Sequence, residues 1–206
     1  MTESNQTSTA KRAYKKGADR RQEIAGAVLS ILSAPRLEKF TTKEIAAQVG
    51  VSEACLYRHF ASKADILMML VDFCDQSFRA MFAEVEANSA YPTQLAKSAA
   101  KLSCLLSFAS ANPGLVRLLT GEAIAYESDR VQERVVGTIR RAELSIKETL
   151  KQAAVVGEIP AHTNVGLRAN IIMSIAQGRW RRFTESGFKD DPLAGRLGLE
   201  ALVMAY

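Results

Sequence analysis

The chain has 206 residues, of which 48% are hydrophobic and 24% are charged, and its formal net charge is +5. This length and composition are typical of a folded protein with a sizeable core, and they exclude a low-complexity chain. The three cysteines, Cys55, Cys74 and Cys104, are too few and too scattered for a disulfide framework or a zinc ribbon. No apolar stretch of membrane-spanning length and no secretory signal is present, so we expect a cytoplasmic protein with reduced thiols and no membrane association.

The positive charge is concentrated in the first third of the chain. Residues 1–63 contain 11 Lys and Arg against 6 Asp and Glu, whereas residues 64–206 contain 16 of each. Clustered cations bind the nucleic-acid backbone because they displace its condensed counterions. A basic head on a neutral body therefore fits a DNA-binding domain, although charge alone fits a basic tail without a partner equally well.

The N-terminal residues predict an arm followed by a helix. Residues 1–10 carry no large apolar side chain after Met1, and six basic residues follow, Lys11, Arg12, Lys15, Lys16, Arg20 and Arg21. We expect residues 1–18 to form a disordered basic arm. Four apolar residues then recur at helical spacing: Ile24, Val28, Ile31 and Leu32. Pro35 is expected to end this helix.

A helix-turn-helix is predicted over residues 41–60. Thr41 and Glu44 form a capping box at the start of its first helix, and Gly50 suits the left-handed residue that ends it. Ser52 can cap a second helix that continues to the end of the unit. Apolar residues hold the corner between the two helices: Ile45, Ala46, Val49, Val51 and Leu56.

The rest of the chain also predicts helices. Ser62 followed by Asp65 starts a fourth, long helix, and prolines and glycines divide the remainder into helices over 93–111, 114–121, 127–156, 163–187 and 192–206. No segment shows the alternation of a strand. We therefore expect an all-α fold of about nine helices, with a helix-turn-helix domain over 19–66 and a larger helical dimerisation and partner-binding domain over 67–206.

A helix-turn-helix places the start of its second helix in the major groove of DNA, while its first helix crosses the backbone. Ser52, Glu53, Ala54 and Cys55 are then nearest the bases, and Glu53 can accept a hydrogen bond from a cytosine amino group. Four donors are placed for phosphate contacts: Tyr57, Arg58, His59 and Lys63. Structural roles are the alternatives: a core aromatic for Tyr57, a core histidine for His59, a packed small residue for Cys55 and a helix-dipole contact for Glu53.

This segment resembles the signature of TetR-type transcriptional regulators. The resemblance lies in Thr41-Thr42-x-x-Ile45-Ala46-x-x-Val49-Gly50-Val51-Ser52-x-x-x-Leu56-Tyr57-x-His59-Phe60-x-Ser62-Lys63. It implies a three-helix DNA-binding domain and a helical domain that dimerises through its last two long helices. It also implies phosphate contacts from Tyr57, His59 and Lys63 and places residues 53–55 near the bases. We include Thr41 and Thr42 in the DNA-binding set.

Patches of the second half resemble the nucleoid-occlusion factors of that family. They are Asn112-Pro113-Gly114-Leu115-x-Arg117-Leu118-Leu119-Thr120-Gly121, Tyr126-Glu127-x-Asp129-Arg130-x-Gln132-x-Arg134 and Ser186-x-Phe188-Lys189. This resemblance implies a homodimer that binds many palindromic sites on double-stranded DNA. It also implies that the dimer engages the tubulin-like division protein FtsZ, with Phe73 and Asn112 at partner-binding positions. Cys104, Ser107 and Ala111 depart from the pattern.

Two charged segments each allow two interpretations. Basic and acidic residues alternate along residues 127–148, which is typical of a solvated helix face, with a partner surface as the alternative. The cluster Arg179-Trp180-Arg181-Arg182-Phe183 favours dimer contacts, because Trp and Arg are enriched at interfaces. The alternative is a buried Trp180 between solvated arginines.

No motif predicts an enzyme. The two histidines, His59 and His162, are far apart in the sequence, and there is no phosphate loop, nucleophile elbow or dinucleotide fingerprint. We therefore expect no catalytic residue, no metal and no cofactor. The leading hypothesis is a DNA-binding nucleoid-occlusion factor. The alternative is a repressor of a neighbouring operon that responds to a small-molecule ligand, which requires a cavity with convergent polar groups. A scaffold without DNA binding is disfavoured by the basic head.

Overall fold

The computed structural model describes residues 19–37 and 41–205, so the predicted arm over 1–18 lies outside the described residues. The described ranges are helical and contain no strand, which confirms the all-α prediction. Residues 19–32 are helical, and they are followed by α2 (Thr42–Val49), α3 (Glu53–Tyr57), α4 (Lys63–Ala87), α5 (Gln94–Ala111), α6 (Pro113–Leu119), the 3₁₀ turn η1 (Glu122–Ile124), α7 (Asp129–Val155), α8 (Val165–Glu185) and α9 (Arg196–Met204).

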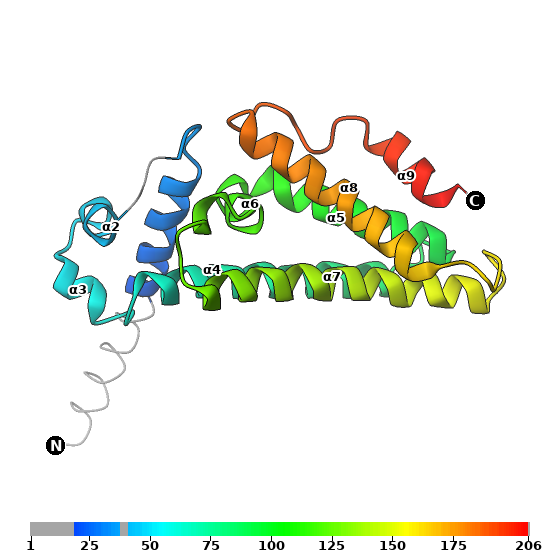
Figure 1. Ribbon diagram of the computed structural model, residues 1–206, viewed down its shortest axis with the longest axis horizontal. Helices are drawn as coiled ribbons and strands as arrows, with labels where there is room; N and C mark the ends of the chain where they lie inside the picture. The colour runs from blue at the N-terminus through cyan, green and yellow to red at the C-terminus, as the bar shows by residue number, and fades with distance from the viewer. Residues whose placement is uncertain (1–18, 38–40, 206) are drawn as a thin grey trace, which may run out of the picture.

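The helices form a small head at one end of an elongated body (Figure 1). The head consists of the helix over 19–32 with α2 and α3. The long helices α4 and α7 run side by side in the same direction along the body, and α8 returns toward the head. Helix α5 lies inside the body, where it contacts α4, α7, α8 and α9. Because α4 begins beside the head and continues along the whole body, it connects the two parts.

The head has its own apolar core. Ile24, Val28 and Leu32 of the first described helix are completely buried, as are Ile45 of α2 and Leu56 of α3. These residues lie on the faces that the helical spacing predicted. The amphipathic pattern therefore placed the buried face of each head helix correctly, because one face of each short helix packs on the others.

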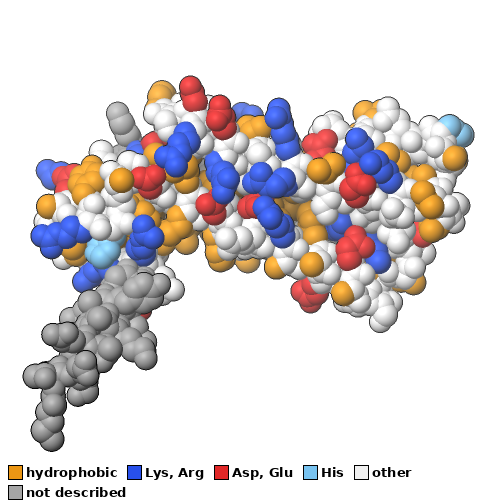
Figure 2. Space-filling view, turned by 90° about the horizontal axis from the view of Figure 1, so that it is seen from below, with side chains coloured by type: hydrophobic (Ala, Val, Ile, Leu, Met, Phe, Trp, Pro, Cys, Tyr) orange, Lys and Arg blue, Asp and Glu red, His pale blue; other side chains and the backbone are white. Residues whose placement is uncertain are grey.

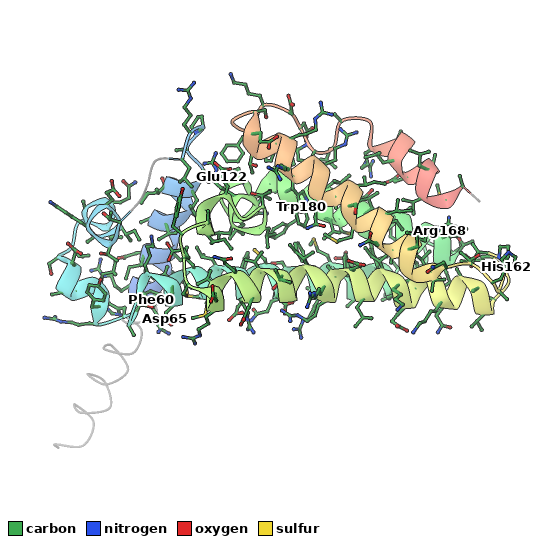
Figure 3. All side chains as sticks on the ribbon, in the orientation of Figure 1. Phe60, Asp65, Glu122, His162, Arg168 and Trp180 are labelled. Atoms are coloured by element: carbon green, nitrogen blue, oxygen red, sulfur yellow. The ribbon has the colours of Figure 1, made fainter. Side chains whose placement is uncertain are left out.

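The body core contains Trp180, so the prediction that this residue makes dimer contacts is wrong. Trp180 is fully buried, and its indole N–H donates to the main-chain oxygen of Leu105 at 3.1 Å. Its ring stacks on Phe78 of α4, with centroids 6.0 Å apart. Figure 3 shows the side chain pointing into the body. The neighbouring Arg181 and Arg182 are exposed, as expected on the outer face of the same helix.

Three arginines of α7 form ion pairs with three aspartates of α4. Arg130 pairs with Asp65 at 3.6 Å, Arg141 pairs with Asp75 at 2.6 Å, and between them Arg134 pairs with Asp72. Basic and acidic side chains intermingle on this face of the molecule (Figure 2). The charged pattern of 127–148 therefore includes residues that pair across the two parallel helices.

A buried lysine joins three helices of the body. Lys101 of α5 is only 2% exposed, and its ammonium contacts Glu86 of α4 at 2.8 Å. It also donates to the hydroxyls of Ser145 and Thr149 on α7, at 3.0 and 2.6 Å. A buried charge is tolerated only when it is paired and hydrogen-bonded, and these contacts meet both conditions.

The head is fastened to the body by Arg117 of α6. Its side chain is fully buried, and Nη1 donates to the main-chain oxygen of Leu32 in the head at 2.6 Å. The Glu122 carboxylate lies 3.3 Å from Nε, and the guanidinium lies 4.4 Å from the centroid of the Phe188 ring. In the sequence, Arg117 stands out only as part of a segment that resembles the family. Its neighbours in the sequence do not indicate that it is buried.

Some predicted helix ends need correction. The second helix of the helix-turn-helix ends at Tyr57 and not at residue 60, because the amides of Arg58 and His59 bond to oxygens only three residues earlier. The last helix starts at Arg196 and not at 192, because Asp191 caps a turn through the amide of Leu193. The 3₁₀ turn η1 was not predicted.

Asn112 is at the N-cap position of α6 but does not cap it. Its side-chain amide donates backward to the main-chain oxygen of Phe108 at 2.9 Å, and it makes no side-chain hydrogen bond to the first turn of α6. Pro113 at the first position of α6 has no N–H to satisfy, so this helix needs one donor fewer at its start. The Asn112 side chain therefore bonds to the last turn of α5, and Pro113 suits the first position of α6.

Candidate nucleic-acid interface

The ends of the helix-turn-helix are fixed by the side chains that the sequence predicted. The Thr41 hydroxyl accepts from the amide of Glu44 at 3.3 Å, and the Glu44 carboxylate accepts from the amide of Thr41 at 2.5 Å. Gly50 ends α2 with φ of 75°, a conformation that other residues adopt at a cost. Ser52 then caps α3 by accepting from the amide of Cys55 at 3.2 Å. The sharp turn between α2 and α3 therefore follows from local chemistry.

The first turn of α3 presents small side chains to solvent. Ser52 and Ala54 are exposed, and Cys55 is half-buried. Small residues at the N-terminal end of a recognition helix allow close approach to the edges of bases. Arg58, at the other end of α3, is exposed as well. Both ends of α3 are therefore accessible from solvent.

Glu53 is bound within the head. Its Oε2 accepts a hydrogen bond of 2.8 Å from the hydroxyl of Thr42 on α2. The hydroxyl of Tyr57 lies 3.5 Å from the same Thr42 oxygen, and the Tyr57 side chain is 48% exposed. The structure thus brings together three of the predicted site residues and does not bury Tyr57 as a core aromatic. Thr42 links α2 to both ends of α3.

Arg21 has a role that the sequence did not reveal. The sequence placed it in a run of basic residues near the N-terminus, but its Nε and Nη2 both donate to the main-chain oxygen of His59, at 3.0 and 2.9 Å. Its guanidinium also lies 4.8 Å from the centroid of the Phe60 ring. Arg21 therefore holds the end of α3 against the first described helix. Only the fold brings these residues together, because they are 38 positions apart in the chain.

Lys63 is the last of the predicted phosphate donors, and it lies at the start of α4. Its cap is as predicted, because the Ser62 hydroxyl accepts from the amide of Asp65 at 3.2 Å. The Lys63 ammonium forms an ion pair of 2.5 Å with Glu127, a residue of the body that precedes α7. Glu127 belongs to one of the segments that resemble the family, but the sequence did not indicate its contact with Lys63.

The predicted partner-binding residues differ in exposure. Phe73 on α4 is 52% exposed, which is unusual for a phenylalanine on a helix that otherwise buries its apolar side. Asn112 is half-buried, and its side-chain amide donates to the main-chain oxygen of Phe108. On α5, Ser107 and Ala111 are exposed and Cys104 is half-buried. Phe73 is thus the more accessible of the two predicted contacts.

Two open hollows lie along the seam between α4 and α7. The larger, about 550 Å³, is lined by both signs of charge and by two methionines, Met68 and Met69. The smaller, about 250 Å³, is lined by Phe78 and Phe82 together with charged residues at its rim. Arg141 lines both hollows, so they adjoin one another.

Within residues 19–37 and 41–205, no group of three or more His, Cys, Asp and Glu side chains could hold a metal ion. Figure 3 places His162 at the end of the body opposite Phe60, the neighbour of His59. No single described helix is long and apolar enough to cross a bilayer, and α5 with α6 meets that test only as a pair bent by 116°.

Two family models match the two parts of the chain. Residues 37–68 match the model described as "Bacterial regulatory proteins, tetR family". Residues 94–196 match "Tetracyclin repressor-like, C-terminal domain", a model of the SlmA-like kind. The chain belongs to the tetR family of bacterial regulatory proteins.

Among its curated relatives are proteins named nucleoid occlusion factor SlmA. The one from Idiomarina loihiensis is 36% identical over 177 residues, which cover 84% of this chain and 88% of that protein. The one from Marinomonas sp. is 33% identical over 175 residues, which cover 85% of this chain and 88% of that protein. The resemblance that the sequence patches indicated is therefore confirmed along most of the chain.

Solved structures with similar folds are transcriptional regulators. FadR from Bacillus subtilis, in complex with stearoyl-CoA, has a TM-score of 0.74 at 18% identity and covers 89% of this chain and 97% of its own. AibR, in complex with isovaleryl coenzyme A and operator DNA, has a TM-score of 0.70 at 14% identity with the same coverages. At these identities the likeness establishes the fold alone.

Proposed function

We propose that this protein is a non-enzymatic nucleoid-occlusion factor of the cytoplasm. It binds chromosomal DNA as a dimer and blocks assembly of the FtsZ division ring over the nucleoid. The observation that carries the proposal is the extended similarity to relatives that bear this name, together with a helix-turn-helix whose recognition helix is exposed. No cofactor is required, because binding and not chemistry is the activity.

The proposed DNA contacts come from α3 and from the residues around it. Ser52, Ala54 and Cys55 lie at the start of α3 and approach base edges, and the second oxygen of Glu53 accepts from a base. Six further residues lie next to the sugar-phosphate backbone of the DNA: Thr41, Thr42, Tyr57, Arg58, His59 and Lys63. Contacts of this second kind set the position of the protein on DNA without reading sequence. The excess positive charge of residues 1–63 supports the same assignment.

We propose that dimers form through α7 and α8. Each helix carries large apolar residues on its outer face, with Val136 and Leu144 on α7 and Leu167 and Ile171 on α8, all between 44% and 57% exposed. Two copies that pack these faces together would remove them from water, which is the main driving force for association. A two-fold dimer presents two recognition helices about one DNA turn apart, or about 34 Å, and therefore selects palindromic sites.

The surface proposed to engage FtsZ includes Phe73 of α4. A half-exposed phenylalanine on a rigid helix is the kind of anchor that contributes most to a protein interface. Asn112 is the second proposed contact, although its amide would first have to leave the Phe108 oxygen. The surface is on the body, so a dimer can hold DNA with its heads and FtsZ with its bodies.

The alternative function is a repressor that responds to a small molecule. The observation that favours it is the hollow of about 250 Å³ between α4 and α7, which combines apolar side chains with several polar and charged ones. It is open and smaller than most ligand pockets, so it carries less weight than the similarity of the whole chain.

A genome-wide map of the bound protein separates the two functions. Nucleoid occlusion predicts many dispersed sites, mostly away from promoters and sparse near the replication terminus. One or two sites beside its own gene or a transporter operon would contradict it. FtsZ sedimentation with DNA-bound protein is the second measurement. Phe73→Ala should lose the effect on FtsZ while keeping DNA binding, and Leu202→Ala, which removes an exposed side chain of α9, is the matched control.

A further inference from the structure

Lys63 and Glu127 form an ion pair that joins the head-proximal end of α4 to the loop before α7. The ammonium and the Oε1 atom of the carboxylate are 2.5 Å apart, and the two side chains are only 24% and 15% exposed. An ion pair shielded from water in this way is screened less by salt than one on an open surface. The contact is therefore a firm link between the segment that follows the recognition helix and the body.

The same ammonium is one of the donors that DNA binding would use. Lys63 follows Ser62, the cap of α4, directly after the helix-turn-helix, where it is placed to reach a backbone phosphate. A phosphate at that position would bring a second negative charge up to Glu127. Two anions around one ammonium repel each other, so each weakens the hold of the other on Lys63.

We propose that Glu127 and the DNA backbone compete for Lys63, so that the start of α7 responds to DNA on the head. The inference rests on the proposed DNA binding and deepens it. It makes Glu127 a positioning residue of the body that lowers the affinity of the head for any duplex, whatever its sequence.

The contacts around Glu127 explain how the response reaches the body. The main-chain oxygen of Glu127 accepts from the side-chain amide of Gln132 at 3.1 Å, inside the first turns of α7. Two residues after Lys63, Asp65 pairs with Arg130 at 3.6 Å, and both residues line the larger hollow between α4 and α7. When Glu127 is released from Lys63, the longer Asp65–Arg130 pair remains between the start of α7 and the start of α4 (Figure 3, where Asp65 is labelled).

Thermodynamic linkage makes the coupling reciprocal. If DNA loosens the Lys63–Glu127 pair, any ligand or partner that favours the closed pair weakens DNA binding by the same factor. A partner that favours the released loop strengthens DNA binding in equal measure. Tyr126 is 97% exposed beside Glu127, so a partner on the body has direct access to this loop.

The test is a titration of the full chain with a mixed-sequence duplex at several salt concentrations. Such a duplex needs no knowledge of the operator, because phosphate contacts do not depend on sequence. The variants are Glu127→Gln, Lys63→Gln and the double substitution. Asp129→Asn is the matched control, because it removes the same charge from an exposed position two residues further along. Thermal unfolding followed by circular dichroism verifies that each variant is folded.

We expect Glu127→Gln to bind the duplex roughly two- to fivefold more tightly, the range for a single ion pair of this kind. Asp129→Asn should bind like the wild type, and Glu127→Gln should add nothing in the Lys63→Gln background. An equal gain from Glu127→Gln and Asp129→Asn would overturn the inference, as would a gain that persists without Lys63, because either result indicates general electrostatics. Either of these outcomes contradicts the competition for Lys63 but not the proposed DNA binding. If the wild-type protein binds no duplex, both the competition and the proposed DNA binding are wrong.

Hydrogen exchange gives a second readout that does not depend on affinity. The amides of Glu127, Val131 and Gln132 are bonded within the loop and the first turn of α7. DNA should accelerate their exchange in the wild type, and Glu127→Gln should show fast exchange without DNA. Exchange in this segment that is unchanged by DNA, while the duplex is bound, would overturn the inference.

Discussion

Arg117 on α6 and Leu32 in the head are joined by a buried hydrogen bond of 2.6 Å from the guanidinium to the main-chain oxygen. The same side chain reaches the main-chain oxygens of Ala34 and Pro35. The last four oxygens of a helix have no partner within it, and buried ones need donors from elsewhere. A single buried guanidinium thus supplies donors to the end of the first described helix and to the turn that follows it.

Arg117→Met should therefore destabilise the whole protein. We expect the free energy of unfolding to fall by about 2–4 kcal/mol, because the Leu32, Ala34 and Pro35 oxygens lose a charged donor at once. Arg117→Lys is the informative control, since one ammonium keeps the charge but cannot span three oxygens. Urea denaturation measures both, and a loss below about 1 kcal/mol for the Met variant would show that the junction does not depend on this residue.

Gly114 lies where α6 approaches the head most closely. A Cβ atom at this position would be 2.8 Å from both the Leu29 oxygen and the Ser33 hydroxyl. Gly114→Ala should cost about 1–3 kcal/mol in unfolding free energy, because the helix over 19–32 must shift. Gly26→Ala is the matched control, since nothing lies within 4 Å of its Cβ position. There we expect a gain of about 0.5–1 kcal/mol from helix propensity. Equal effects in thermal melts would contradict the close approach.

Stability should depend on pH through Glu86 and Lys101. Burial raises the pKa of Glu86, but hydrogen bonds from Lys101, Thr149 and Lys97 outweigh it and hold the pKa below its usual 4.5. Burial lowers the pKa of Lys101, against the effect of Glu86. A carboxylate with a lowered pKa stabilises the fold above its unfolded-state value, and this contribution disappears as pH falls through the folded-state pKa.

Glu86→Gln should accordingly be less stable at neutral pH and indistinguishable from the wild type in acid. We expect a neutral-pH loss of about 1–2 kcal/mol, kept small because Glu86 is 42% exposed and Lys101 retains two hydroxyl acceptors. Urea melts between pH 7 and pH 3 measure the difference. A difference that stays constant below the usual glutamate pKa would show that the ionised carboxylate is not what stabilises the network.

The cysteines provide a footprint of the proposed interface. Cys55 is half-buried on the recognition helix, whereas Cys74 is fully buried and burial raises its pKa to about 12. Duplex DNA at ten times its Kd should slow maleimide labelling of Cys55 by about tenfold. Cys104 on α5 is the internal control, because its rate should not change. Cys74 should stay unlabelled until the protein unfolds. Unprotected Cys55 would place the DNA elsewhere.

Glu53 offers a test of base reading. Its Oε2 atom is bound to Thr42, and a glutamine can keep that bond while it turns an N–H₂ group toward the DNA. We expect Glu53→Gln to shift the preference at one base pair by about 1–3 kcal/mol with unchanged thermal stability. Selection from a randomised duplex pool measures this shift. An unchanged preference would leave Glu53 with a positioning role only.

The sequence by itself determined the helices of the head and the turn between them. Thr41, Ser52 and Ser62 cap amides only three residues away, and Gly50 ends α2 through its own backbone conformation. Such contacts join neighbours in the chain, so a capping pattern specifies them before any tertiary packing forms. The apolar spacing likewise identified the buried faces of these helices. Prolines and glycines divided the remainder of the chain into helices, and family resemblance supplied the functional assignment of the body.

The tertiary structure alone decided which charged and aromatic residues are buried or paired. Arg21 binds His59, Lys63 binds Glu127, and Arg117 is buried between the head and the body. Nothing in the sequence around these three basic residues distinguishes them from solvent-exposed ones. Trp180 is in the core and not at a dimer surface. The physical reason is that these contacts join residues far apart in the chain. The energy of a charge depends on the partners and the water that the complete fold leaves around it.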